Sequence, residues 1–316
     1  MIRGGLYLKI PALAGIFVFA MLLSGCATQQ AERLMKAWPT NLPTHIQNKH
    51  VPFFPQEDFE CGPASLAMVL QTAGIKILPE DLLQQVYLPG RQGSLQVEML
   101  IASRRNGAIG YLLAPDLESI LREVSAGNPV LVFQNLSLAI YPVWHYAVVT
   151  GFDRERNVVM MHSGRTPNLE MSLFTFERTW TRGGNWAMVA LPPTRLPVTA
   201  IARPYAESVA AVERINPALA QIAYTAALEK WPDNLTLMFG AGNSAYALGK
   251  PQLAAEAYRR LLKSYPDFAD AWNNLAQSLL DIGQHEAAAD AINRAVALGG
   301  LRLLQYRELQ RQINKQ

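Results

Sequence analysis

The chain has 316 residues, with 28 lysines and arginines against 25 aspartates and glutamates, and half of its residues are hydrophobic. This length is enough for two domains of ordinary size, each with its own core. The near balance of charge gives no reason to expect a nucleic-acid partner. The sequence has no glycine-rich phosphate loop and no common zinc-ligand spacing, so we expect no cofactor and no metal.

The first 26 residues have the pattern of an export signal. Arg3 and Lys9 precede an apolar run over 10–23, which ends in the sequence LSGC at Cys26. A run of about 14 apolar residues is short for a membrane span, and the two small residues before the cysteine suit a signal peptidase. We therefore assign residues 1–25 to a signal peptide.

The cleavage box resembles the bacterial lipoprotein signal, which implies cleavage before Cys26 and acylation of that cysteine. The acyl chains would then hold the protein on a membrane. Because Ala27 follows in place of an aspartate, the resemblance implies the periplasm and the inner leaflet of the outer membrane. Cys61 would be the one thiol left, and a lone thiol in an oxidising compartment is either buried and inert or a nucleophile.

Composition divides the rest of the chain into four parts. Residues 26–50 are polar, contain prolines and have no sustained apolar period, which predicts a tether. The expected parts are the tether at 26–50, a first folded domain at 51–192, a proline-rich linker at 193–204 and helical repeats at 205–316.

The first domain reads as helices followed by strands. Apolar spacing predicts helices at 62–73, 79–87, 94–105 and 116–126, with Ser94 and Asp116 as N-caps and Gly74 as a left-handed C-cap. After Pro129 five short segments are rich in β-branched and aromatic residues: PVLVFQ, WHYAVVTGF, NVVMMHS, MSLFTF and NWAMVAL. This order predicts an α+β domain with an antiparallel sheet.

The last third repeats itself with a period of 34 residues. Under that shift WPD at 231–233 meets YPD at 265–267, and Gly249 meets Gly283. The period and the small residues at packing positions are the tetratricopeptide signature, so we expect an all-α solenoid. Residues 218–230 fit the second helix of an earlier repeat, and the polar segment 301–315 fits a capping helix. The groove of such an array would take a peptide or protein partner, although a solenoid that only stabilises its neighbour is the alternative.

The sequence QEDFECGPASLAM places Cys61 at the start of a predicted helix. Free backbone N–H groups and the helix dipole favour the thiolate there, which is the nucleophilic form of cysteine. Gly62 leaves access to the sulfur, and Pro63 suits a first helical turn. Gln56, five residues upstream, could direct an amide N–H at the oxyanion that forms when a carbonyl is attacked.

A thiol nucleophile needs a base, and the chain has five histidines. His45 and His50 lie in the expected tether and His285 in the repeats. His145 begins the strand WHYAVVTGF, and His162 ends the strand NVVMMHS. His145 is therefore the candidate base.

Gln56, then Cys-Gly-Pro-Ala from Cys61 at a helix start, then His-Tyr-Ala-Val-Val from His145 in a strand, resembles the C39 peptidase family. The resemblance covers residues 51–192 and implies a papain-like fold and a polypeptide substrate. It also implies that Cys61 is the nucleophile, His145 the general base and later acid, and Gln56 the oxyanion donor together with the backbone N–H of Cys61.

The sequence departs from the family where many members have an aspartate that orients the histidine. Pairing WHYAVVT with NVVMMHS, with partner numbers adding to about 308, brings His162 or Ser163 opposite His145. Asp153 lies roughly 26 Å further along the strand and cannot take this role. We name His162 as the candidate orienter, with a plain cross-strand partner as the alternative reading of this histidine.

These features together predict a lipid-anchored periplasmic cysteine peptidase whose repeats recruit a substrate or partner. Two other hypotheses remain open. The first is a catalytically inactive adaptor that binds peptides, and the second is an amidase or acyltransferase on the same fold.

Overall fold

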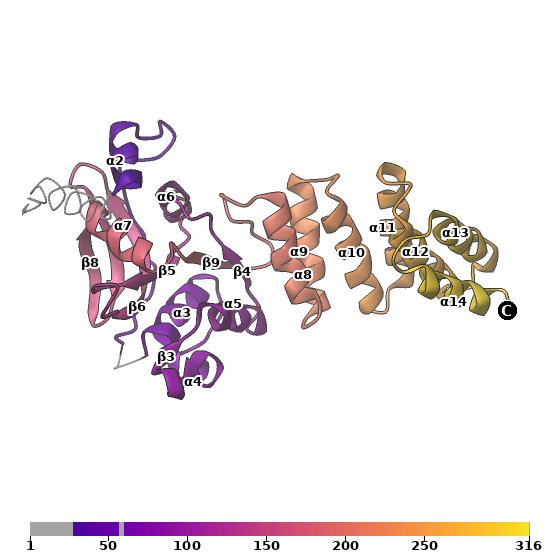
Figure 1. Ribbon diagram of the computed structural model, residues 1–316, viewed down its shortest axis with the longest axis horizontal. Helices are drawn as coiled ribbons and strands as arrows, with labels where there is room; N and C mark the ends of the chain where they lie inside the picture. Colours follow the sequence, from indigo (N-terminus) through magenta and orange to yellow (C-terminus); the bar gives the residue numbers. More distant parts are fainter. Residues whose placement is uncertain (1–27, 57–59, 316) are drawn as a thin grey trace, which may run out of the picture.

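The computed structural model describes residues 28–56 and 60–315, so the predicted signal peptide and Cys26 lie outside the described residues. The molecule is elongated, with a sheet domain at one end and a row of paired helices leading away from it (Figure 1). Within the described ranges, no helix has both the length and the apolar character needed to cross a membrane.

The first domain is built on a seven-stranded sheet in which every pairing is antiparallel. The strand order is β4-β9-β5-β6-β7-β8, and β1 adds to β6. The strands are β1 (His45–Gln47), β4 (Ile109–Leu112), β5 (Val130–Asn135), β6 (Trp144–Asp153), β7 (Val158–Ser163), β8 (Thr166–Ser172) and β9 (Ala187–Leu191). A separate two-stranded ribbon joins β2 (Tyr87–Leu88) to β3 (Gly93–Ser94).

Helices cover both faces of the sheet, as the alternation of its side chains requires. Tyr146 and Val148 of β6 share a core with α3 (Cys61–Thr72), α4 (Pro79–Val86) and α5 (Gln96–Arg105). Ala147 and Val149 share the opposite core with α2 (Gln29–Lys36), α6 (Leu117–Ser125) and α7 (Leu173–Arg182). The predicted α+β class with an antiparallel sheet is confirmed.

Most predicted elements are present, and two need correction. Asp116 caps α6 by accepting from Ser119 N at 2.7 Å, and Gly74 has a φ of +87° after α3. Ser94, however, lies in β3 and caps no helix. The segment MSLFTF, expected as a strand, instead contains the end of β8 and the first turn of α7.

The expected tether is not a tether over its described part. The N-terminus of α2 lies on the carboxylate of Glu177 in α7, which accepts from Gln30 N at 3.0 Å and from Ala31 N at 2.8 Å. Glu177 is buried, so the charge is compensated by these two donors and by the helix dipole. The amide of Gln30 further bonds Pro115 O and Leu117 N. Composition could not reveal this contact because the partners lie over 80 residues away.

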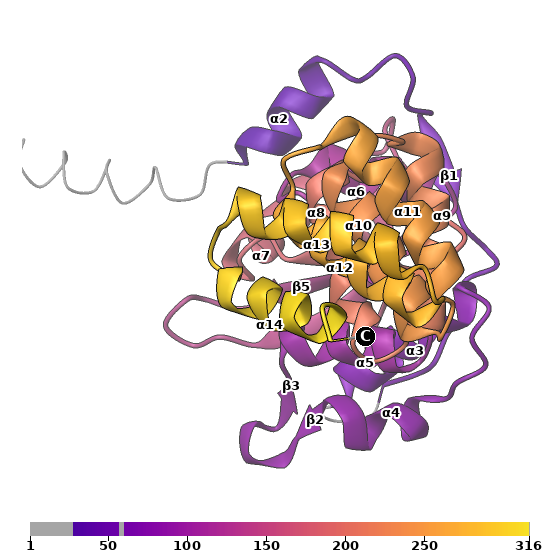
Figure 2. The same ribbon diagram turned by 90° about the vertical axis from the view of Figure 1, so that its right-hand side faces the viewer.

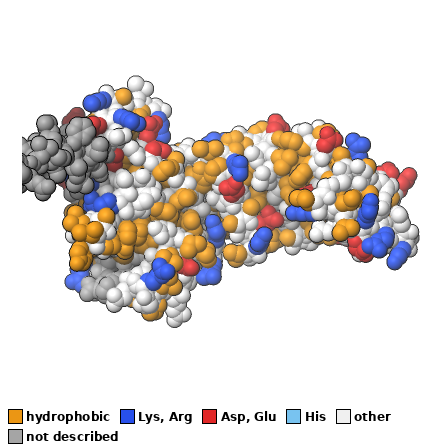
Figure 3. Space-filling view, in the orientation of Figure 1, with side chains coloured by type: hydrophobic (Ala, Val, Ile, Leu, Met, Phe, Trp, Pro, Cys, Tyr) orange, Lys and Arg blue, Asp and Glu red, His pale blue; other side chains and the backbone are white. Residues whose placement is uncertain are grey.

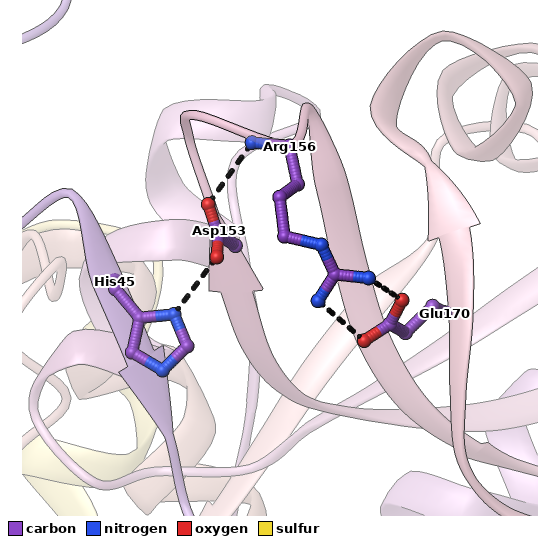
Figure 4. A network of polar contacts seen from close by, with 4 residues as sticks. All are labelled: His45, Asp153, Arg156 and Glu170. Carbon is purple, nitrogen blue, oxygen red and sulfur yellow. Dashed lines mark hydrogen bonds and ion pairs between the residues drawn. The ribbon is translucent and has the colours of Figure 1, made fainter.

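Polar contacts also fix β1 at the far end of β6 (Figure 4). His45 Nδ1 lies 3.2 Å from Asp153 Oδ2, and Arg156 N donates to Asp153 Oδ1 at 3.0 Å. The guanidinium of Arg156 meets the Glu170 carboxylate with both of its terminal nitrogens. Asp153 thus serves the β6–β7 turn, in agreement with the expectation that it lies away from His145.

The expected linker at 193–204 is packed against the sheet domain. The buried carboxylate of Glu123 accepts from Thr199 N at 2.8 Å and from Thr199 Oγ1 at 2.6 Å. Ile201 N donates to Tyr111 Oη at 3.2 Å, and the first repeat helix already begins at Ala202. Proline content alone therefore mispredicts a loose connection here.

Seven helices follow: α8 (Ala202–Glu213), α9 (Pro217–Lys230), α10 (Leu235–Ala247), α11 (Pro251–Ser264), α12 (Ala269–Asp281), α13 (His285–Leu298) and α14 (Leu303–Ile313). Gly249 and Gly283, which the 34-residue shift aligns, end α10 and α12 with φ angles of +68° and +75°. Only glycine adopts this backbone readily, so the repeated sequence and the repeated turn have one cause. Viewed along the long axis, these helices stack in front of the sheet domain (Figure 2).

The two parts of the molecule share one hydrophobic core. Tyr111 of β4 packs on Tyr205 of α8 with ring centroids 6.1 Å apart, and Tyr205 packs on Trp231 at 6.0 Å. Tyr111 and Tyr205 are almost fully buried. A continuous cluster of buried residues therefore runs from the sheet into the first repeats.

We predict that Glu177→Ala releases α2 from the domain. Two backbone N–H groups lose a charged acceptor, so the free energy of unfolding should fall by about 2 kcal/mol. Hydrogen exchange should accelerate first at the amides of α2. The matched control is Glu118→Ala, which removes a partly exposed pair with Arg122 and should change stability by less than about 0.5 kcal/mol. Unchanged exchange in α2 would contradict the capping role of Glu177.

Candidate active site

Cys61 is the first residue of α3, as the sequence predicts, and its side chain is half-buried. Burial raises the pKa of the Cys61 thiol, while the backbone N–H groups of Tyr146, Gly62 and Cys61 itself lower it. The start of α3 does direct backbone N–H donors at the sulfur, but burial raises the pKa of the thiol by more than these donors lower it. The expected thiolate is therefore not the resting form favoured by this environment.

The ribbon of β2 and β3 forms a wall beside the thiol. Tyr146 Oη donates to Ser94 O at 3.1 Å, which attaches the ribbon to β6. A Cβ atom on Gly62 would lie 2.2 Å from Ser94 Oγ, so the residue after the thiol must be glycine. Gly62 thus allows the close approach of α3 to this wall, in addition to the access expected from the sequence.

His145 lies near the start of β6, opposite Gln134 of β5. Its Nε2 is 2.8 Å from Ser163 Oγ at the end of β7. Burial lowers the pKa of His145 to about 4, so the imidazole is neutral near pH 7. Since Ser163 engages Nε2, the remaining nitrogen, Nδ1, is the one available to a thiol.

Cys61 and His145 line one cavity. Within the part of the chain that the structure describes, no hydrogen bond joins the Cys61 sulfur to the His145 imidazole. The raised pKa of the thiol and the lowered pKa of the imidazole both favour a neutral pair. These two pKa shifts thus disfavour a preformed ion pair between Cys61 and His145.

His162 does not orient His145, and that expectation is corrected. It lies opposite Val148, where its Nε2 is 3.3 Å from Val51 O and its Nδ1 accepts from Asn168 N at 3.2 Å. Burial lowers the pKa of His162, and Phe53 packs edge-on against its ring. His162 is thus the plain structural partner that was the alternative reading.

Ser163 takes the position expected for an orienter. The β6–β7 turn comes later than the sequence pattern indicates, and a bulge between Val149 and Gly151 shifts the pairing again. His162 therefore lies opposite Val148 and does not reach His145, whereas Ser163 is within hydrogen-bond distance of it. A serine hydroxyl fixes the ring through a hydrogen bond but supplies no negative charge.

Gln56 is buried and lies in the same cavity. Its Oε1 accepts from Gly164 N at 3.1 Å, and its Nε2 donates to Ser65 Oγ at 3.2 Å. The backbone donor at Gly164 fixes which end of the amide is oxygen. One Nε2 hydrogen remains beyond the bond to Ser65, which fits the expected oxyanion donor.

The cavity that joins these groups has a volume of about 1080 Å³. The predicted residues Gln56, Cys61 and His145 all line it, and so do Ser94, Tyr146 and Trp144, to which the sequence analysis gave no role in the site. Trp144 directly precedes His145. An aromatic residue next to the candidate base is therefore the sequence signal by which this part of the cavity wall could have been found. The described residues contain no cluster of three His, Cys, Asp or Glu side chains that could hold a metal ion.

A second cavity of about 660 Å³ lies in the helical repeats. Asn243, Asn274 and Gln277 line it from α10 and α12, while Arg302 and Glu308 line it from the C-terminal region. Amide side chains can both donate to and accept from a polypeptide backbone. The cavity lies in the part of the chain where the sequence predicts a groove.

Comparison with known families agrees with the division into a sheet domain and helical repeats. Residues 48–188 match the model of the Peptidase_C39 like family, and residues 205–251 and 239–300 match the tetratricopeptide repeat model. No curated protein matches the chain.

Two solved structures are each similar to part of the chain. A crystal structure described as a C39-like peptidase from Bacillus anthracis is 18% identical, covers 47% of this chain and 98% of its own, and has a TM-score of 0.40. The Sgt2 TPR domain from Aspergillus fumigatus is 21% identical, covers 35% of this chain and 81% of its own, and has a TM-score of 0.32. On the family matches, the chain joins a region similar to the Peptidase_C39 like family to a region similar to tetratricopeptide repeats.

Proposed function

We propose that the protein is a cysteine peptidase that cleaves a polypeptide in the cavity between α3 and the start of β6. The observation that carries this proposal is the presence of Cys61, His145 and Gln56 in one cavity, with a hydroxyl on the far nitrogen of the imidazole. These are the nucleophile, base, oxyanion donor and orienter that acyl transfer requires.

The proposed reaction begins from the neutral pair. His145 Nδ1 takes the thiol proton while the sulfur of Cys61 attacks the peptide carbonyl, and the oxyanion meets Gln56 Nε2 and the backbone N–H of Cys61. The C–N bond then breaks, and the leaving amine takes its proton from His145. Water, deprotonated by the same imidazole, attacks the thioester and releases the acid and the thiol.

In this proposal the repeats recruit the substrate or a partner protein, and the lipid on Cys26 holds the enzyme at the inner leaflet of the outer membrane. The amide-lined cavity between α10, α12 and the C-terminal region supports the first statement. The sequence LSGC supports the second. An amine that attacks the thioester in place of water would make the same site a transferase or amidase.

A peptide-binding adaptor without hydrolysis is the second candidate. Two observations favour it: burial raises the pKa of Cys61, and no hydrogen bond joins its sulfur to His145. The two candidates differ in whether removal of the sulfur changes any product.

The experiment that tests the proposal compares cells carrying the parent chain with cells carrying Cys61→Ala. Protein N-termini in the periplasm and outer membrane are identified by mass spectrometry. We expect new termini in parent cells that disappear with Cys61→Ala and with His145→Ala. Identical sets of termini would refute the peptidase and leave the adaptor.

The neutral pair predicts a distinctive pH dependence. His145 must be unprotonated, so kcat/KM should rise through pH 4 to 5 and stay level towards alkaline pH. Alkylation of Cys61 by iodoacetamide should be slow at pH 6 and rise about tenfold per pH unit, because only the thiolate reacts. Fast alkylation that is independent of pH between 5 and 8 would instead show a preformed thiolate–imidazolium pair.

Substitution of Ser163 tests the orienter. Ser163→Ala removes the hydrogen bond to Nε2 and should lower kcat/KM about tenfold, equivalent to ~1.4 kcal/mol. Ser163→Asp places a carboxylate beside the imidazole and should move the acid limb of the pH profile upwards, because a nearby negative charge raises the pKa of histidine.

His162→Gln serves as the control for this series. It changes the neighbouring residue, which faces Val51 and Asn168, and should leave the acid limb in place. If His162→Gln moved the limb and Ser163→Asp did not, the assignment of Ser163 would be wrong.

A further inference from the structure

The connection between β5 and β6 exposes a run of apolar side chains. We call this connection together with the first residue of β6, residues 136–144, the apolar loop; Ile140 is 78% exposed and Tyr141 77%. Its other exposed apolar residues are Leu136, Leu138, Val143 and Trp144. Hydrophobic side chains gather on the sheet domain in the face that Figure 3 draws. A contiguous exposed apolar surface of this kind marks a site of interaction.

Hydrogen bonds hold the apolar loop in one shape. Buried Asn135 accepts from Ser137 N and from Val143 N, each at 3.0 Å, and its Nδ2 donates to Leu138 O at 3.4 Å. Leu138 and Tyr141 also form a β-bridge. The loop therefore presents its apolar side chains on a built turn.

The base of the apolar loop continues into the candidate active site. Val143 and Trp144 line the cavity that holds Cys61. Trp144 stacks on Phe133, another lining residue, with ring centroids 5.2 Å apart and planes 12° apart. A ligand that binds in the cavity and extends outwards beside His145 would thus pass directly onto the apolar loop.

Cationic groups accompany this apolar surface. Arg91, Arg165 and Arg182 line the cavity, and no aspartate or glutamate is among the described residues that do so. Arg182 donates from Nε and Nη2 to Asn135 O, at 3.3 Å and 3.1 Å. Asn135 therefore both shapes the apolar loop and positions the guanidinium of Arg182. The fork geometry of a guanidinium suits a carboxylate.

We propose that the cavity and the apolar loop together bind a polypeptide segment in which carboxylate side chains stand next to large apolar ones. The apolar side chains pack on the loop, and a carboxylate meets Arg182. This inference rests on the proposed function for the identity of the cavity as a peptide site. It adds the class of substrate, which the catalytic residues alone do not define.

Binding is tested with the full chain carrying Cys61→Ala, so that no peptide is consumed. Two labelled pools of synthetic dodecapeptides carry leucine or phenylalanine at alternate positions, with glutamate at the remaining positions of one pool and lysine in the other. Fluorescence anisotropy at low ionic strength should show at least about tenfold tighter binding of the glutamate pool. The preference should shrink as salt is added.

Two pairs of variants separate the charge from the apolar surface. Arg182→Gln should abolish most of the preference for glutamate, whereas Arg178→Gln, on the exposed side of the same helix, should not. Ile140→Ser combined with Tyr141→Ser should weaken both pools about tenfold. Leu304→Ser, at a site 79% exposed in α14, is the matched control and should have no effect.

Equal affinity for the two pools, or a preference that survives Arg182→Gln, would overturn the inference. A lipid bilayer is the competing occupant of the apolar loop, and vesicles of brominated phospholipid test this alternative. Bromine quenches tryptophan fluorescence, so quenching in the parent chain that is lost in Trp144→Phe would place the loop in lipid. That result would also overturn the inference. Preference for the glutamate pool without cleavage by the parent chain would retain the binding inference and refute the peptidase. Cleavage by the parent chain without a preference for the glutamate pool would refute the binding inference and retain the peptidase.

Discussion

The contact between the backbone N–H of Tyr146 and the sulfur of Cys61 joins the two halves of the candidate active site. Pairing of β6 with β7 begins only at Val148, so the first residues of β6 keep that edge open. The N-terminus of α3 approaches this stretch, where Gly62 allows contact with Ser94. Everything that the site can do follows from a helix start held against an incompletely paired strand.

This arrangement explains why the thiol and the imidazole are both neutral. The core that fixes α3 on β6 also removes water from the thiol, and the neighbouring strands bury His145. A preformed ion pair would need enough Coulomb attraction to offset the desolvation of both charges. Ser163 offers a hydrogen bond without charge, so nothing on the far side of the ring adds to that attraction. The absence of the aspartate and the neutrality of the pair are thus two aspects of one electrostatic environment.

The features that the sequence predicted well are those encoded by local pattern. The placement of Cys61 at a helix start depends on residues within one turn, and the 34-residue period places Gly249 and Gly283 at equivalent turns. His145 in a strand follows from a run of β-branched neighbours. Each of these depends on neighbours in the chain, so a single sequence contains the necessary information.

Most of the wrong predictions involve long-range contacts or backbone irregularities. Docking of α2 depends on Glu177, which is 146 residues from Ala31, and packing of the predicted linker depends on Glu123. The start of α7 was misread because LFTF has high β-propensity, although Phe176 and Trp180 have helical spacing and stack on each other. The choice between His162 and Ser163 depended on the position of the β6–β7 turn and on a bulge in β6, and a one-residue shift reverses which side chain faces a given side.

The shared core between the sheet and the repeats constrains how recruitment could assist cleavage. Tyr111, Tyr205 and Trp231 leave no free linker between the two parts, so the repeat cavity and the catalytic cavity stay at a fixed separation. In the proposed function, a protein held on the repeats would raise the local concentration of its own cleavage site. That gain depends on the flexible length between its two contact regions and vanishes when the segment is too short to span the gap. Selection of a substrate would then combine three independent requirements: a sequence that fits the repeats, a segment that fits the catalytic cavity, and a suitable distance between them.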